Sequence, residues 1–121
     1  MIVAISAVGK NKNDNLDGRF GRCECFHIID TEKSNLRIMS NKGAASGGGA
    51  GIAAASQLIE EGVDVIITGS LGPNAYELVE KSGIKAYSCD MVPVQEAVKM
   101  LEKNLLTPIK KAGVAHHGIS G

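Results

Sequence analysis

The chain has 121 residues, with 13 Lys and Arg against 13 Asp and Glu, 15 glycines, two Tyr, two Phe and no Trp. Balanced charge argues against nucleic acid as the main partner, because nucleic-acid binders gain affinity from an excess of basic side chains. So few rings also leave little to stack on bases. The length predicts one domain, the 44% apolar fraction excludes disorder of the whole chain, and no apolar run is long enough to span a membrane.

The first forty residues predict three strands. The apolar run over 2–7 fits a strand buried on both faces, and it lacks the basic region of a signal peptide. Residues 9–18 are rich in turn formers and predict an exposed loop. Strands over 25–30 and 35–40 are separated by a short connection over 31–34, which predicts an antiparallel hairpin.

Helices and strands alternate after the hairpin. The pattern predicts a helix over 50–61, a strand over 63–68, a helix opened by Gly72-Pro73 and ended by Gly83, a strand over 84–88, and a helix from Pro93. Together these elements predict an α/β fold with a mixed sheet. Residues 105–121 show no clear period, so we expect one domain over 1–104 followed by a flexible tail over 105–121.

A glycine-rich segment before the first predicted helix is one candidate site. Its candidate residues are Gly47, Gly48, Gly49 and Gly51. Glycines at this place let backbone N–H groups approach an anion, and the helix N-terminus adds about half a positive charge. The segment matches neither the P-loop nor the dinucleotide fingerprint. It is either a flexible connection with close helix packing or a loop that binds an anion.

Cys23 and Cys25 form a second candidate site. An i, i+2 pair in extended backbone projects both side chains from one face, with Cα atoms roughly 6–7 Å apart, a spacing suited to two irons of one cluster. Arg19 and Arg22 would favour the thiolate of Cys23. The alternative is that Cys25 is a small core residue and Cys23 lies at the entrance of a strand.

Other residues carry weaker signals. The pair His116-His117 could supply imidazole ligands to a metal, or it could belong to an exposed tail without a role. Cys89 follows a predicted strand, at the end where ligands bind in open α/β sheets, while His27 is expected to be packed in a strand. Three cysteines without a secretory signal are expected to be reduced thiols in the cytoplasm.

Signatures of enzyme chemistry are missing from the sequence. There is no G-x-S-x-G elbow, no recognisable Ser-His-Asp arrangement and no set of carboxylates typical of a two-metal site. We therefore expect a binding protein rather than an enzyme.

Several motifs together resemble a known family. They are RFGRC over 19–23, the glycine-rich run, Gly69-x-x-Gly72-Pro73-x-Ala75, and PVQEAVKML over 93–101. Because these motifs occur in this order, the chain resembles a small stand-alone member of the dinitrogenase iron–molybdenum cofactor biosynthesis family over residues 1–103. The resemblance implies a ribonuclease-H-like three-layer fold, with helices on both faces of a five-stranded mixed sheet in the order 3-2-1-4-5.

The resemblance also implies a function. Family members are carriers or chaperones of iron–sulfur or iron–molybdenum cluster precursors. Cys23 occupies a position where cluster-linked relatives often place a Cys, whereas Arg19 stands where such relatives tend to have His. We therefore expect a cytoplasmic, non-catalytic carrier that exchanges its cluster with a donor or acceptor protein. Cys23 and Cys25 would ligate the cluster, the glycine-rich backbone with Arg19 and Arg22 would face its charge, and His116 or His117 would close over it.

Two alternatives stay open. The first is a regulatory module that binds a small anion or metabolite through the glycine-rich loop, without metal. The second is a thiol-based redox enzyme, which requires a low thiol pKa at Cys23 or Cys25. Neither alternative involves nucleic acid or a membrane.

Overall fold

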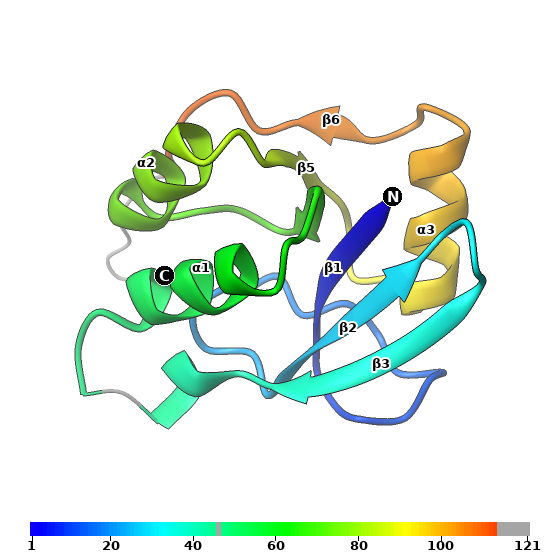
Figure 1. Ribbon diagram of the computed structural model, residues 1–121, viewed down its shortest axis with the longest axis horizontal. Coiled ribbons are helices and arrows are strands. Elements are labelled where there is room, and N and C mark those ends of the chain that lie inside the picture. Colours follow the sequence, from blue (N-terminus) through cyan, green and yellow to red (C-terminus); the bar gives the residue numbers. More distant parts are fainter. Residues whose placement is uncertain (46, 114–121) are drawn as a thin grey trace.

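Figure 1 shows the computed structural model, which describes residues 1–45 and 47–113. The strands are β1 (Ile2–Ala7), β2 (Cys25–Asp30), β3 (Asn35–Ser40), β4 (Val65–Thr68), β5 (Lys85–Ser88) and β6 (Thr107–Pro108). The helices are the short 3-10 helix η1 (Lys42–Ala45), α1 (Ala50–Glu60), α2 (Pro73–Lys81) and α3 (Val94–Glu102). The strands after α1 and α2 begin one or two residues later than their sequence patterns predict.

One mixed sheet contains the six described strands, in the order β3-β2-β1-β4-β5-β6. β1, β4 and β5 are parallel neighbours, and the β2–β3 pair is the antiparallel hairpin that the sequence predicts. The predicted order 3-2-1-4-5 is confirmed, but the predicted number of five strands is wrong. Thr107 and Pro108 add a sixth strand antiparallel to β5. Two residues are too few to show a period of two, and a proline is tolerated only because this strand is at the sheet edge.

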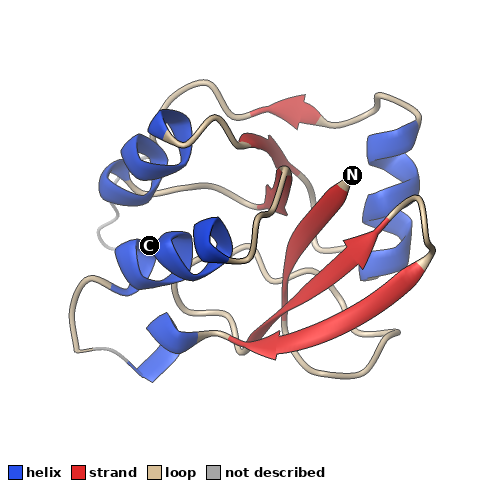
Figure 2. Ribbon diagram, viewed as in Figure 1, coloured by secondary structure: helices blue, strands red, loops and turns tan. Residues whose placement is uncertain are grey.

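Helices cover both faces of the sheet. α1 and α2 lie on one face and α3 on the other (Figures 1 and 2). β1 is buried between these layers, so its side chains alternate between two cores: Ala4 packs under α1 and α2, while Val3 and Ile5 pack under α3. This alternation explains why five of the six residues of the strand are apolar, Ser6 being the exception. The likeness to the ribonuclease-H fold stays a prediction.

The segment after α3 is folded against the domain as far as the structure describes it, which corrects the expected flexible tail over 105–113. The Ile109 N–H donates to Ala86 O (2.9 Å), Tyr76 Oη donates to Lys110 O (2.6 Å), and the Gly113 N–H donates to Leu71 O (2.7 Å). The segment lacks a period because single hydrogen bonds to distant elements hold it. His116 and His117 lie outside the described residues.

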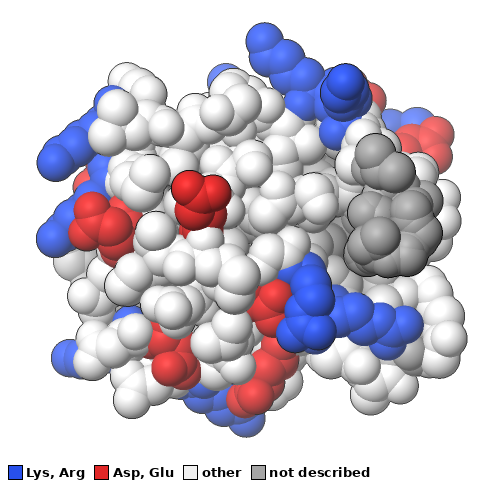
Figure 3. Space-filling view, turned by 180° about the vertical axis from the view of Figure 1, so that it is seen from behind, with Lys and Arg blue, Asp and Glu red and all other residues white. Residues whose placement is uncertain are grey.

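The surface carries charges of both signs. On the face seen in Figure 3, acidic and basic side chains are interspersed and much of the middle is uncharged. Among the described residues, no helix has the length and apolar character needed to cross a membrane.

Candidate anion-binding pocket

A pocket of about 450 Å³ lies at the carboxyl ends of β1 and β4. The residues that line it come from four parts of the chain: 18–22 after β1, 49–52 at the start of α1, 70–75 between β4 and α2, and Gly113. After β1 the chain continues to β2, and after β4 it continues to β5. β2 and β5 lie on opposite flanks of the central β1–β4 pair in the strand order. Such a divergence is where open α/β sheets bind ligands.

Glycines allow the walls of the pocket to touch backbone to backbone. A Cβ atom on Gly69 would lie 2.7 Å from the Gly18 backbone, and one on Gly21 would lie 2.9 Å from the Gly51 nitrogen. These distances are too short for any side chain larger than hydrogen. The loop after β1 is thereby seated against both the end of β4 and the first turn of α1.

Buried Asn41 holds the same loop through hydrogen bonds to its backbone. Its Nδ2 group lies within hydrogen-bond distance of the carbonyl oxygens of Phe20 (3.4 Å), Gly21 (3.2 Å) and Cys23 (2.9 Å). Its Oδ1 accepts a hydrogen bond from the Gly43 N–H (2.9 Å). Asn41 is buried, so these bonds are shielded from water and hold the backbone of the pocket loop in one position.

Two helix N-termini meet at the pocket, and both are capped by glycine. Gly49 precedes α1 with φ 69°, a left-handed conformation that favours glycine, and Gly72 precedes α2 in extended backbone. Neither N-cap residue makes a side-chain hydrogen bond to its helix. The first N–H groups of a helix have no partner within it, and each N-terminus carries about half a positive charge. α2 begins with Pro73, which has no N–H, so the donors at the pocket come from residues 50–52 of α1 and from Asn74 and Ala75 of α2.

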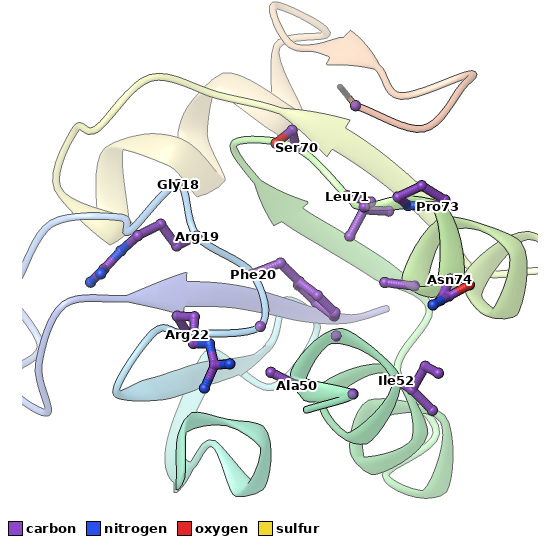
Figure 4. A pocket seen from close by; sticks show the side chains of 16 residues that line it. Gly18, Arg19, Phe20, Arg22, Ala50, Ile52, Ser70, Leu71, Pro73 and Asn74 are labelled. Atoms are coloured by element: carbon purple, nitrogen blue, oxygen red, sulfur yellow. The ribbon is translucent and has the colours of Figure 1, made fainter. Parts of the chain in front are cut away.

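Two arginine side chains also belong to the pocket lining. Arg19 and Arg22 line the pocket, and none of the described lining residues is acidic. Figure 4 shows both arginines on one side of Phe20, with Ile52 and Asn74 on the other. Arg19 is mostly exposed and forms an ion pair with Asp17, Nη2 to Oδ2 2.9 Å. The arrangement suits an anion.

The sequence candidates divide between the pocket and other places. Arg19, Arg22, Gly49 and Gly51 line the pocket, whereas Gly47 and Gly48 do not. The wall over 70–75 and Gly113 were not predicted as site residues. A sequence signal for the 70–75 wall exists, because Gly72-Pro73 opens a helix directly after a strand that is buried in the sheet.

The two predicted cluster cysteines do not face each other. The expectation that they project from one face is wrong: Cys23 packs in the core under α1 and α2, and Cys25 packs in the core under α3. β2 begins at Cys25, so Cys23 lies in the preceding turn, where strand alternation does not apply. All three cysteines are free thiols, and none of them lines the pocket.

The thiols are also strongly disposed to stay protonated. Burial raises the pKa of Cys23 to about 12 and that of Cys25 to about 11, and it raises the pKa of Cys89 as well. This direction is opposite to the expected activation of Cys23 by neighbouring arginines, because the loss of hydration dominates the pKa of that thiol. Cys23 Sγ donates to Phe20 O (3.4 Å), and Cys25 Sγ donates to Gly9 O (3.1 Å).

His27 and Cys89 have structural positions. His27 is fully buried in β2, as expected, with its Nε2 2.9 Å from Gly9 O. Cys89 packs in the core under α3. Within the described residues, no group of three or more His, Cys, Asp or Glu is arranged to hold a metal ion. The polar donors along the described pocket lining therefore include backbone N–H groups and the guanidinium groups of Arg19 and Arg22.

Comparison with known proteins gives consistent matches. The sequence pattern of the family described as dinitrogenase iron-molybdenum cofactor matches residues 1–104. An uncharacterised protein from Methanocaldococcus jannaschii is 32% identical over 91 residues, which cover 73% of this chain and 77% of that protein.

Two solved structures are similar over almost their whole length. The apo form of the orange protein from Desulfovibrio gigas has a TM-score of 0.88 at 27% identity, covering 93% of this chain and 96% of that one. A Thermotoga protein described as belonging to the DUF35 family has a TM-score of 0.82 at 30% identity, covering 95% of this chain and 98% of that one.

Proposed function

The chain belongs to the dinitrogenase iron-molybdenum cofactor family, and from this premise we propose that it is a non-catalytic carrier of an anionic metal–sulfur cluster. The cargo is of the iron–sulfur or iron–molybdenum type, taken from a donor protein and released to an acceptor. One observation supports this most: two helix N-termini without side-chain caps and two arginines converge on one pocket that has no described acidic lining residue. The orange protein, whose structure is described as an apo form, supports it by analogy.

The donors present fit a metal–sulfur anion held from outside its metal ions. Cluster sulfides accept hydrogen bonds from backbone N–H groups, and arginines balance the negative charge. Ligation by Cys23 is less well supported, because that thiol is fully buried, absent from the pocket lining and hydrogen-bonded to Phe20 O. Holding the cargo without a thiolate bond would also make its release to an acceptor easier.

The two histidines remain part of the proposal. Gly113 lines the pocket, and His116 follows it by three residues in the sequence. Both histidines lie outside the described residues, so their contact with the cargo stays a prediction. We propose that one of them contacts the cargo when it is bound.

The absence of acid–base groups in the described pocket lining supports a binding role. Its ionisable side chains are Arg19 and Arg22, which keep their charge at any physiological pH. General acid–base chemistry needs a group that exchanges a proton near neutral pH. The described pocket residues can bind and orient an anion but do not offer such a group.

Anaerobic loading tests the carrier function. The purified chain is incubated with tetrathiomolybdate, and separately with iron and sulfide, then desalted and examined for visible absorption and metal content. We expect retained colour with the native chain and its loss in the double variant Arg19→Gln/Arg22→Gln. The matched control is Lys85→Gln/Lys110→Gln, which removes the same charge from a groove beside α2 and β5. If the native chain retains neither probe, the cluster proposal fails.

Substitution of Gly72 tests the role of the helix N-termini. A Cβ at Gly72 would meet nothing within 4 Å, and its backbone is extended, so an aspartate fits there. Gly72→Asp would cap α2 and stabilise the fold by a few tenths of a kcal/mol to about 1 kcal/mol. It would also place a negative charge at the pocket, so we expect binding at least about tenfold weaker. Gly72→Asn is the uncharged control, and unchanged binding by the aspartate variant would contradict this placement of the cargo.

A regulatory module for a small anion is the second candidate. The observation that favours it is the lack of Cys and His among the described lining residues, because a phosphate group could use the same N–H and guanidinium donors. A thermal-shift comparison separates the two functions, since a ligand that binds the native state raises the unfolding midpoint. Stabilisation by inorganic phosphate or nucleotides, without retention of either metal–sulfur probe, would favour the regulatory module.

A further inference from the structure

Asp17 is a buried acid directly behind the pocket loop. It is 3% exposed, while the side chain of Arg19 is 68% exposed. The carboxylate accepts three hydrogen bonds from Arg19: from the backbone N–H (2.9 Å), from Nε (3.1 Å) and from Nη2 (2.9 Å). Arg19 therefore forms a bidentate ion pair with Asp17 and adds a hydrogen bond from its backbone N–H. Bidentate pairing is the strong geometry for arginine and carboxylate groups.

The pair changes the charge that the pocket can offer. Burial alone would raise the pKa of Asp17, but the hydrogen bonds from Arg19 outweigh it and hold that pKa below its usual value. Asp17 is therefore ionised and neutralises Arg19. In Figure 4 the Arg19 side chain extends away from Phe20, so its guanidinium is held outside the centre of the pocket.

We propose that Asp17 sets the affinity and the release rate of the bound anion by competing with it for Arg19. This inference rests on the proposed function, because it assumes that the pocket binds an anion. An incoming anion gains the full charge of Arg19 only by drawing it away from Asp17. The buried carboxylate would then be left with the backbone N–H of Arg19 as its remaining described donor, a state of high free energy.

This competition would let a carrier bind the anion reversibly. When the anion leaves, Asp17 recaptures Arg19 and restores a fully satisfied buried ion pair. The loop that presents both residues is anchored independently, since Ser6 Oγ donates to Asp17 O (2.5 Å) and accepts a hydrogen bond from the hydroxyl of Thr68 (2.8 Å). Exchange of Arg19 between its two partners therefore needs only a side-chain movement.

The variant Asp17→Asn tests the proposal with tetrathiomolybdate as the probe. Asparagine keeps an oxygen that can accept the Arg19 backbone N–H but removes the charge. We expect binding tighter by on the order of tenfold, most of it as slower release after dilution. A merely structural role of Asp17 would loosen the loop and weaken binding, so the direction of the change distinguishes the two.

Two further variants complete the test. Asp64→Asn removes the same charge at the opposite end of the strands, where Asp64 accepts the Ile2 N–H (2.8 Å), and we expect it to change binding less than twofold. In an Arg19→Gln background, Asp17→Asn should lose most of its effect, because no guanidinium remains to compete for. If the native chain binds the probe and Asp17→Asn binds it equally or more weakly, the proposed role of Asp17 is overturned but the proposed function is not. If none of these chains binds the probe, the proposed function is overturned as well.

Discussion

The pocket loop and the cysteine segment are adjacent in the chain but offer opposite chemistry. Arg22 lines the pocket, and Cys23, the next residue, is fully buried in the core under α1 and α2. On the pocket side, charged groups and N–H donors meet a space open to a ligand. On the cysteine side, burial raises the pKa of each thiol and hydrogen bonds to carbonyl oxygens occupy it.

This difference shows that residue type alone does not identify a ligand site. Cysteine is the usual iron ligand, but it acts as a thiolate, and a thiol kept neutral by burial cannot. Glycine has no ligating side chain, yet the two glycine N-caps do not occupy the N–H groups in the first turns of α1 and α2, although Pro73 contributes none. Four experiments test this contrast, from the largest expected effect to the smallest.

The largest effect concerns thiol reactivity. At pH 7, thiols with a pKa of about 11 to 12 are deprotonated at least about a hundredfold less than a free cysteine. We therefore expect Cys23 and Cys25 of the native chain to react with iodoacetamide at least about a hundredfold more slowly than in urea-unfolded chain at the same pH. Mass spectrometry of the labelled peptides measures this. Rapid labelling of Cys23 in the native chain would revive the thiol-based redox enzyme.

The next effect concerns the glycine contact that forms the pocket wall. Gly69→Ala would bring a Cβ to 2.7 Å from the Gly18 backbone, so we expect a loss of about 2 kcal/mol in the free energy of unfolding. Chemical denaturation measures it. Gly47→Ala is the matched control, because a Cβ there meets nothing within 4 Å, and it should change stability by less than about 0.5 kcal/mol. Equal effects of the two variants would argue against a close-packed wall.

A third effect concerns stability at alkaline pH. Burial raises the pKa of the Cys23 thiol from 9.0 to about 12 in the folded chain. The stability that comes from the protonated thiol is therefore fully present below about pH 9 and is lost as the pH rises toward 12. We expect it to fall by about 1.4 kcal/mol per pH unit in that range. Urea unfolding at pH 8, 9 and 10 measures the slope, and Cys23→Ala should reduce it. Identical slopes in both chains would show that the thiol is not held neutral by the fold.

The smallest effect is expected for cargo binding by the cysteine variants. Cys23→Ala and Cys25→Ala remove no described lining residue of the pocket, so retained tetrathiomolybdate should change less than twofold. The same measurement on Arg19→Gln/Arg22→Gln should show the large loss expected for pocket residues. If Cys23→Ala loses the probe as completely as the arginine variant, the thiol is a ligand after all.

Much of the fold follows from local sequence patterns. The apolar run in β1, the hairpin spacing of β2 and β3, and the helix ends were predicted because each depends on residues close together in the chain. β6 was not, since a two-residue strand exists only through its pairing with β5. The same reason explains the segment up to Gly113, which is held by single hydrogen bonds to α2, β5 and the loop after β4.

The site was predicted only in part. Arg19, Arg22, Gly49 and Gly51 carry chemistry that can be recognised in sequence, and they line the pocket. The wall over 70–75 was missed because it lies about fifty residues from Arg19 and reaches the pocket only through the parallel pairing of β1 with β4. The role of Asp17 was missed for a related reason, since an acid in a polar loop gives no sign that it will be buried.

By itself, the sequence determined the elements of this protein, their order in the chain and the kinds of donor group available to a ligand. Periodicity and helix-ending residues act over a few positions, so they can be read locally. Only the tertiary structure decided that Cys23 and Cys25 face different cores, that two helix N-termini share one pocket, and that Asp17 neutralises Arg19. Burial, pKa and the direction of a side chain depend on neighbours from distant segments, and those neighbours exist only once the sheet has assembled.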